Sequence, residues 1–299
     1  MGHMIELGIL GLDTSHAERF ADYIETLPYV TVVSVWDSGM IRDDEYIREF
    51  CKVYGVDRVE RPTELVGTVD GVLILSVNWD EHVSLAKPHL ESGLPVLIDK
   101  PLAGSMEDLD RLAALATDAR LFGGSALPYH PEIDRLPKGA PERSLFCVGY
   151  DDPFYYGAHL ADLANTLTDS RWLSVTPCDH SECTVSVEFE DGTHATLRLD
   201  GPEAEQSFGV LDVTTTISTA RVESSKTVLA KMYPPYLDTF LQVLRGNHDP
   251  TDRLLDGARL LLAINAAIRS KQVVTRTSGQ LASVDIDGGE FAASYEPYY

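Results

Sequence analysis

The chain has 299 residues, 44% of them hydrophobic, and its 47 acidic residues against 24 Lys and Arg give a formal net charge of -23. This excess of negative charge repels phosphate backbones and anionic membranes, so it argues against a nucleic acid or a membrane surface as partner. A chain of this length exceeds the usual size of one domain, and we therefore expect two domains, each with its own core.

Cysteine content and hydropathy indicate where such a protein works. No stretch approaches the roughly 20 apolar residues that span a bilayer, and the first residues do not form a secretory signal. Four cysteines are too few for a disulfide framework, so we expect a cytoplasmic protein.

Cys178, His180 and Cys183 form one cluster of metal-ligand composition, but no second cluster supplies a fourth ligand, and we expect no metal site. An acidic, lysine-poor surface suits a high-salt cytoplasm; an acidic protein of ordinary salt is the alternative.

The first 125 residues alternate short apolar runs with helical patterns, which is typical of parallel strands joined by helices. The runs predict strands over 4–12, 30–37, 70–77, 95–99 and 120–126. Helical periodicity occupies 14–27, 43–55, 80–93 and 105–119. We therefore predict an α/β fold that begins with a doubly wound parallel Rossmann sheet over residues 4–125, with its ligand crevice at the carboxyl ends of the strands.

The pattern changes after residue 125. Alternating runs predict strands over 144–150, 183–200, 208–219, 220–224 and 226–230, with a hairpin turn at residues 190–192, Glu-Asp-Gly. Helices are predicted over 157–167, 235–246 and 251–270. We expect residues 126–299 to form an α+β domain for substrate binding and oligomerisation, with a mainly antiparallel open sheet. Because helices cover one face of that sheet, the other face invites pairing, and we expect a homo-oligomer, a dimer or a tetramer.

The opening loop, Gly-Ile-Leu-Gly-Leu-Asp-Thr-Ser-His, follows the first strand where a dinucleotide fingerprint would stand. Asp13 replaces the second glycine, and its carboxylate is expected to cap the next helix by accepting from the amide of Ser15 or His16. Those amides would otherwise bind a pyrophosphate, so the carboxylate competes with the phosphates. We expect nucleotide binding to be retained because the loop keeps other groups that can hold the dinucleotide: Gly8, Gly11, Thr14, Ser15 and His16.

Asp37 ends the second strand, where a Rossmann fold places an acid on the adenosine ribose. A carboxylate there accepts from the ribose diol and repels a 2'-phosphate, and no Arg follows immediately. NAD is therefore the expected cofactor, with NADP as the alternative.

Three stretches in this order resemble the glucose-fructose oxidoreductase and inositol dehydrogenase family, Gfo/Idh/MocA. Residues 69–112 contain the signature Asp99-Lys100-Pro101, residues 155–167 are similar to its Gly-x-His-x-x-Asp helix start, and residues 236–270 resemble its carboxyl-terminal helices. The resemblance implies NAD(P)-dependent hydride transfer to or from a carbinol carbon of sugars, cyclitols and related small molecules.

The family's motifs also imply roles for individual residues. Lys100 would lie beside the nicotinamide and the reacting hydroxyl, and His159 would be the general base or acid, oriented by Asp162. Tyr155 stands where the polyol dehydrogenases carry an Asp, and it could assist the proton transfer; this departure puts the usual polyol substrates in doubt. The crevice residues expected near the nicotinamide ribose and the signature are Ser76, Asn78, His82 and Asp99.

Two other functions stay open at this point. The departures at Asp13 and Tyr155 favour a catalytically silent ligand sensor or partner-binding protein on the same fold. A non-redox lyase or hydrolase that keeps NAD tightly bound is the third hypothesis.

Overall fold

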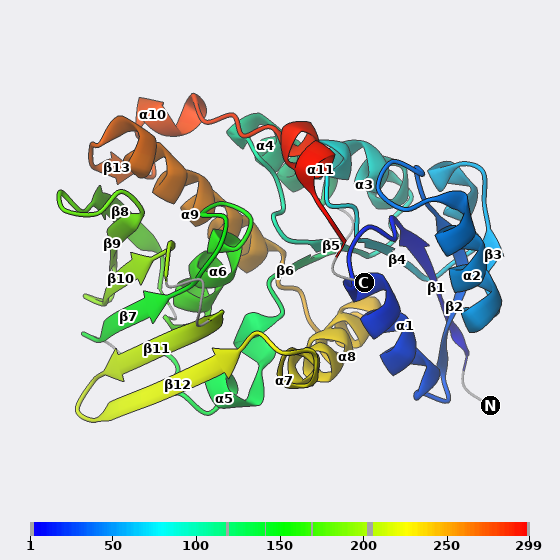
Figure 1. Ribbon diagram of the computed structural model, residues 1–299, viewed down its shortest axis with the longest axis horizontal. Coiled ribbons are helices and arrows are strands. Elements are labelled where there is room, and N and C mark those ends of the chain that lie inside the picture. Colours follow the sequence, from blue (N-terminus) through cyan, green and yellow to red (C-terminus); the bar gives the residue numbers. More distant parts are fainter. Residues whose placement is uncertain (1–2, 118–119, 141, 169, 202–205, 298–299) are drawn as a thin grey trace.

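The computed structural model describes residues 3–117, 120–140, 142–168, 170–201 and 206–297. Two sheets lie side by side, each with its own helices (Figure 1). The first sheet belongs to the amino-terminal part of the chain and the second to the residues after about 140. The last described residues of the chain, drawn in red, return to the region between them (Figure 1).

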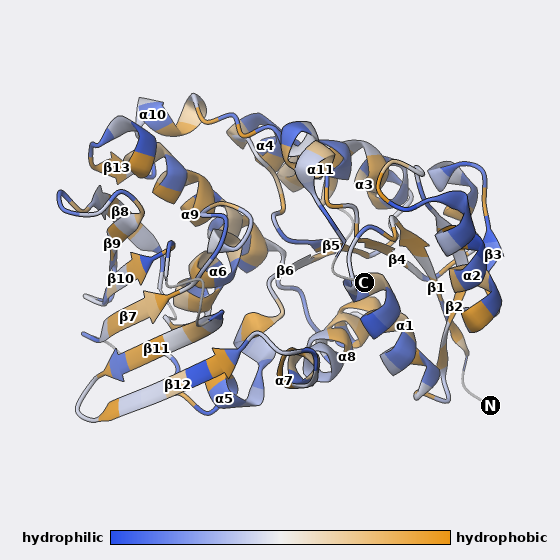
Figure 2. Cartoon of the chain, in the orientation of Figure 1, coloured by the Kyte–Doolittle hydropathy of each residue, from blue (hydrophilic) through white to orange (hydrophobic). Residues whose placement is uncertain are grey.

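The first sheet has six parallel strands in the order β3-β2-β1-β4-β5-β6. Its strands are β1 (Ile5–Leu10), β2 (Val30–Trp36), β3 (Asp57–Arg58), β4 (Gly71–Ile74), β5 (Val96–Asp99) and β6 (Leu121–Gly124). Central strands β4 and β5 are buried along their whole length, and Figure 2 shows their hydrophobic colouring. Such continuous burial is expected of parallel strands covered on both faces.

Helices cover both faces of this sheet. They are α1 (His16–Glu25), α2 (Asp44–Tyr54), α3 (His82–Glu91) and α4 (Met106–Leu115), with short 3-10 turns η1 (Pro62–Leu65) and η2 (Trp79–Glu81). Asp43 and Ser105 cap α2 and α4 through their side chains, and Gly55 ends α2 in the left-handed region. This is the doubly wound Rossmann arrangement that the sequence predicts. Residues 118–119 of the predicted fourth helix lie outside the described residues.

The second sheet has seven strands in the order β12-β11-β7-β10-β9-β8-β13. They are β7 (Ser144–Val148), β8 (Trp172–Pro177), β9 (Thr184–Phe189), β10 (His194–Arg198), β11 (Ser207–Val213), β12 (Ile217–Glu223) and β13 (Val274–Thr275). Six pairings join these seven strands: five are antiparallel, and β7 pairs with β10 in parallel. The sheet is thus mixed and mostly antiparallel. The predicted hairpin at 190–192 joins β9 and β10, with Gly192 at φ 83°.

Helices pack on one face of this sheet and also link it to the first. The remaining elements are η3 (Leu127–Tyr129), α5 (Pro131–Asp134), α6 (Gly157–Leu167), α7 (Lys226–Leu229), η4 (Ala230–Met232), α8 (Tyr233–Leu244), α9 (Thr251–Ser270), α10 (Gly279–Ala282) and α11 (Gly288–Ser294). Helix α8 lies beside α1 (Figure 1), where the Tyr23 hydroxyl donates to Asp238 at 2.8 Å. The carboxyl-terminal segment also returns to the first sheet, since the indole of Trp79 donates to the carbonyl of Ile286 at 2.6 Å.

Three secondary-structure predictions need correction. Residues 226–230, predicted as a strand, form α7 and the start of η4, since Ser225 and the residues after it bond at helical spacing. The two strands predicted over 208–219 and 220–224 have other boundaries. The first strand, β11, ends at Val213, residues 214–216 form a bend, and the second strand, β12, runs from Ile217 to Glu223. Strand β8 and the two-residue strand β3 were not predicted, because they are too short or too irregular to show a period.

None of the described helices combines the length and the apolarity needed to cross a membrane. Among the described residues no group of three or more His, Cys, Asp or Glu side chains is arranged to hold a metal ion.

Candidate active site

The loop after β1 is held tightly against the end of β4. Gly11 has φ 90°, and a Cβ there would meet the amide nitrogen of Ser76 at 2.7 Å, so this position accepts only glycine. The carboxylate of Asp13 accepts from the amide of Val77 at 2.8 Å. The expectation that Asp13 caps α1 is therefore wrong: it reaches across to β4, and the amide of His16 instead donates to the Thr14 hydroxyl at 3.2 Å.

Two buried carboxylates lie in this part of the crevice. Burial raises the pKa of Asp13 to about 6, with the neighbouring charge of Asp37 acting in the same direction, although the Val77 bond opposes it. Asp37 accepts from the amides of Leu12 at 2.6 Å and Gly39 at 2.7 Å. Burial raises the pKa of Asp37 as well. Both carboxylates thus accept hydrogen bonds from the backbone of the loops with which a dinucleotide would make contact.

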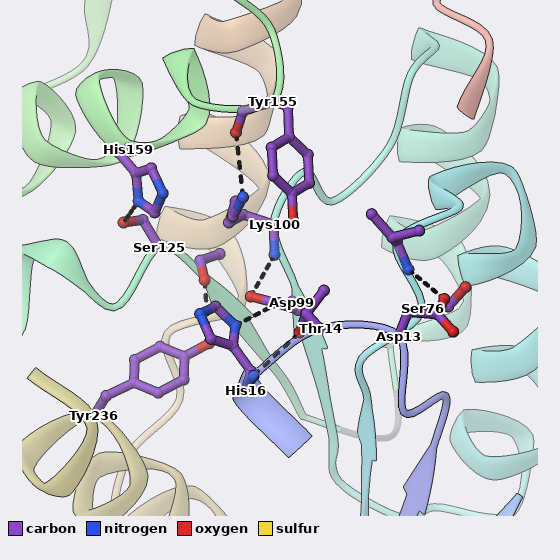
Figure 3. A network of polar contacts seen from close by, with 12 residues as sticks. Asp13, Thr14, His16, Ser76, Asp99, Lys100, Ser125, Tyr155, His159 and Tyr236 are labelled. Atoms are coloured by element: carbon purple, nitrogen blue, oxygen red, sulfur yellow. Dashed lines mark hydrogen bonds and ion pairs between the residues drawn. The ribbon is translucent and has the colours of Figure 1, made fainter. Parts of the chain in front are cut away.

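A cavity of about 300 Å³ opens where the end of β5 meets α1 and α6. Of the predicted site residues, it is lined by Thr14, Ser15, His16, Lys100, Tyr155 and His159. The structure thus brings together residues from three elements that are far apart in the sequence (Figure 3). The other predicted residues lie outside the described lining of this cavity: Gly8, Gly11, Asp13, Asp37, Ser76, Asn78, His82, Asp99 and Asp162.

Lys100 follows the last residue of β5 and is 5% exposed. Its Nζ lies 3.0 Å from the centroid of the Tyr155 ring, a cation–π contact. Burial lowers the pKa of Lys100 to about 7, although Asp99 and two further carboxylates act in the opposite direction. This amine can therefore exchange a proton near neutral pH.

His159 lies in the first turn of α6, and its Nδ1 is 2.6 Å from the Ser125 hydroxyl. Burial holds the pKa of His159 well below its ordinary value, and the charge of Lys100 acts in the same direction. From the sequence we expected Asp162 to orient His159. Among the described residues, however, no hydrogen bond joins these two side chains. The Asp162 carboxylate accepts from the amide of Ser125 at 2.6 Å, so it positions the residue that holds His159.

Asp162 fits its place only because two glycines leave room for it. A Cβ on Gly124 would lie 2.6 Å from its Oδ2, and one on Gly257 would lie 2.6 Å from its Oδ1. Burial raises the pKa of this carboxyl to about 7.

Tyr155 is packed against the carboxyl-terminal segment of the chain. Its ring stacks on Phe291 at 4.6 Å between centroids, and Tyr295 lies at 6.2 Å. Burial raises the pKa of Tyr155 well above its ordinary value. The phenol therefore stays protonated and cannot serve as a base; it covers Lys100.

The residues after β4 build the crevice wall. Asn78 accepts from the amide of Asp80 at 3.1 Å, and His82 is fully buried with its ring nitrogens 3.0 Å and 3.2 Å from the carbonyls of Ser76 and Leu102. Trp79 is buried.

Tyr129 and His130 lie outside the described lining of the cavity. His130 instead caps α5 and contacts the Val228 carbonyl at 3.0 Å. Tyr129 packs edge-on against Tyr236 at 5.3 Å.

Several residues of the site escaped sequence reasoning. Ser125 carries the hydrogen bond to His159, and a small polar residue after the last parallel strand was the only signal for it. The remaining described lining of the cavity consists of Arg19, Leu127, Tyr150, Asp151, Tyr156, Gln206, Phe208, Ser224, Lys226, Leu229, Met232, Tyr233 and Tyr295. Arg19 is on α1, and the others come from loops, helices and strand β11 of the second domain. Their contacts have no local sequence pattern.

Comparisons with known proteins agree with this geometry. The Gfo/Idh/MocA profile, described as an oxidoreductase family with an NAD-binding Rossmann fold, matches residues 5–122. An oxidoreductase from Salmonella typhimurium, YceM, is 26% identical over 117 residues, which are 39% of this chain and 36% of that protein. The match thus spans about a third of that relative's length.

Solved structures show the same fold over almost the whole chain. The apo scyllo-inositol dehydrogenase of Lactobacillus casei superposes with a TM-score of 0.73 at 13% identity, covering 92% of this chain and 99% of that one. The WlbA dehydrogenase of Chromobacterium violaceum, crystallised with NADH and UDP-GlcNAcA, gives a TM-score of 0.71 at 16% identity, covering 92% and 96%. At these identities the likeness shows the fold.

Proposed function

We propose that this chain, whose residues 5–122 match the Gfo/Idh/MocA oxidoreductase family with its NAD-binding Rossmann fold, is an NAD-dependent dehydrogenase of a small sugar, cyclitol or related polyol. The observation that carries the proposal is the cavity in which Lys100 and His159 face the amino-terminal end of α1. Relatives of the same fold were crystallised with NAD or NADH.

The residues present fit a dinucleotide. Thr14, Ser15 and His16 stand at the amino-terminal end of α1 and line the cavity, and such a helix end favours an anionic group. Asp37 lies where it would meet the adenosine ribose, and its negative charge favours NAD over the phosphorylated NADP. When bound, NAD supplies the acceptor for the hydride that leaves a carbinol carbon.

The side chains of the cavity would handle the substrate hydroxyl. The Lys100 amine, with its pKa near 7, donates to or accepts from that hydroxyl and stabilises its developing negative charge. His159 fixes the hydroxyl by a second hydrogen bond. Tyr155 and the carboxyl-terminal Tyr295 exclude water from the Lys100 side of the cavity.

Turnover tests this function directly. Purified protein is incubated with NAD and a panel of cyclitols, hexoses, and their uronic acids, and reduction of the nicotinamide is followed by its absorbance. The proposal expects turnover of at least one polyol of the panel. If the protein binds NADH but turns over none of these compounds, the substrate class is wrong; a protein that binds neither NADH nor NADPH is no dehydrogenase.

We also propose that the chain forms a homo-oligomer through the bare face of the second sheet. Phe146 on β7 and Leu211 on β11 are register partners, and their side chains are 46% and 37% exposed. Adjacent exposed apolar side chains on a sheet face favour pairing with a second copy. Light scattering after size exclusion measures the oligomeric state.

A further inference from the structure

Two histidines face the same cavity from different helices, His16 at the start of α1 and His159 in α6 (Figure 3). The dehydrogenase chemistry proposed above leaves His16 without a part in proton transfer. We propose that His16 is the base of the active site, held by Asp99 with its proton on Nδ1, while Ser125 holds His159 as a hydrogen-bond donor. This inference rests on the proposed function and divides the work within its site.

Asp99 determines where His16 carries its proton. Nδ1 of His16 is 2.6 Å from Oδ2 of Asp99, and the two side chains are 13% and 4% exposed. Burial alone would raise the pKa of Asp99, but the attraction and hydrogen bond of His16, together with the charge of Lys100, hold it below its ordinary value. Because an ionised carboxylate only accepts, the hydrogen must sit on Nδ1.

The other ring nitrogen of His16 then keeps its lone pair. Among the described residues the structure gives Nε2 no hydrogen-bond partner, whereas Nδ1 has Asp99. The ring is fixed in place, since it stacks on Phe20 at 5.4 Å with an interplanar angle of 11° and meets Tyr233 edge-on at 5.3 Å. A fixed imidazole with a free lone pair and a carboxylate behind it is the arrangement of a general base.

Ser125 imposes the opposite tautomer on His159. The hydroxyl of Ser125 has two partners among the described residues. Its oxygen accepts from the backbone amide of Leu127 at 3.0 Å, and Nδ1 of His159 lies at 2.6 Å. Because the amide only donates, the hydroxyl hydrogen must be donated to Nδ1 of His159. Neutral His159 therefore carries its proton on Nε2 and donates a hydrogen bond, so it cannot accept a proton there.

Several charged and titratable groups lie near His16. Asp99 ends β5, Lys100 follows it, and His159 of α6 lines the same cavity. Arg19 of α1 and Lys226 of α7 also line that cavity, Tyr233 of α8 meets the imidazole edge-on, and Tyr236 of α8 packs on Phe20 beside it. The Asp99 carboxylate is the group hydrogen-bonded to the ring.

The proton step balances with the hydride transfer. In the oxidising direction the substrate O–H bond breaks and an N–H bond forms at Nε2 of His16, giving an imidazolium beside ionised Asp99. The two electrons of the carbinol C–H bond leave with the hydride for oxidised nicotinamide dinucleotide, the acceptor that the proposed function names. The substrate carbon becomes a carbonyl, and Asp99 takes up no proton.

Nitrogen NMR of protein labelled at histidine tests the tautomers without any ligand. At about pH 9, where unperturbed imidazoles are neutral, wild-type protein should show a protonated Nδ1 for His16 and a protonated Nε2 for His159. Spectra of the His16→Gln and His159→Gln proteins assign the signals. A protonated Nε2 on His16 overturns the inference.

The Asp99→Asn variant makes the test sharper. The amide of Lys100 donates to Oδ1 of Asp99 at 2.9 Å, so the Asn oxygen should keep that place and its NH2 should face His16. The proton of His16 should then move to Nε2. Unchanged His16 signals would contradict the assignment.

Rates and NADH affinity separate this inference from the proposed function. With the polyol that the panel identifies, His16→Gln should lower kcat about 10²- to 10⁴-fold, and His180→Gln, at an exposed position, should leave it unchanged. NADH titration of each variant reports nucleotide binding independently. Full turnover by His16→Gln overturns the inference while the proposed function stands; if wild-type protein binds no NADH, the proposed function fails and the tautomer spectra still decide the state of His16.

Discussion

Replacing Asp13 by Asn removes one buried charge and keeps its hydrogen bond. The Asn oxygen can still accept from the Val77 amide, and its NH2 lies within reach of Ser76. The variant therefore measures how far the buried negative charge lowers the free energy of unfolding, with almost no change in side-chain shape. Asn also removes a negative charge from the loop that would hold a pyrophosphate.

The magnitude follows from the pKa of Asp13, which burial raises from 3.8 to about 6. A raised pKa means that the folded state binds the proton more tightly, so wild-type stability falls as pH rises through the window between these values. Once the pH is well above both pKa values, this shift has lowered the free energy of unfolding by roughly 3 kcal/mol. Roughly half of it, about 1–2 kcal/mol, falls between about pH 5 and pH 8.

Urea unfolding at these two pH values measures the effect. We expect the free energy of unfolding of Asp13→Asn, relative to wild type, to grow by about 1–2 kcal/mol from about pH 5 to pH 8. The exposed control Asp179→Asn should show no such growth. NADH affinity should rise up to about tenfold in Asp13→Asn. An advantage that is the same at both pH values would refute the reasoning that burial perturbs this carboxyl.

Three further substitutions test the site and the interface. Lys100→Met should lower kcat about 10²- to 10⁴-fold because the site loses its titrating amine, while circular dichroism shows an intact fold; unchanged turnover would exclude Lys100 from catalysis. Ser125→Ala should cost about 1–3 kcal/mol in urea unfolding, since it leaves the Leu127 amide and His159 Nδ1 without their partner; a loss below the error of the measurement would contradict these bonds. Phe146→Lys should yield a monomer by light scattering with an unchanged melting profile, and an unaltered assembly would place the interface elsewhere.

The sequence predicted the parts of the fold that have a local period. Apolar runs and helical faces identified the Rossmann sheet, and α6 and α9 begin and end at the predicted residues. Strand β8 and helix α7 were missed or misassigned because their residues are arranged by tertiary contacts. Residues 226–230 show this: their β-branched and apolar side chains suit a strand, but the bonds to Ser225 form a helical turn.

Motif positions predicted some of the residues that line the cavity, but not what each one touches. Lys100 and His159 meet in one cavity as their motifs implied. The sequence could not show that Asp13 turns to Val77, or that Asp162 acts through Ser125, because each contact joins residues from separate elements. Side-chain direction at a loop depends on which backbone amide lies within reach, and that is decided by the packing of the whole sheet.

Titration with NADH and NADPH, followed by nicotinamide fluorescence in dilute buffer and in molar KCl, tests the central claim most directly. The account predicts saturable binding of NADH, tighter than that of NADPH because Asp37 repels a 2'-phosphate. Binding of neither nucleotide at either salt concentration would contradict the assignment of this crevice to a nicotinamide cofactor.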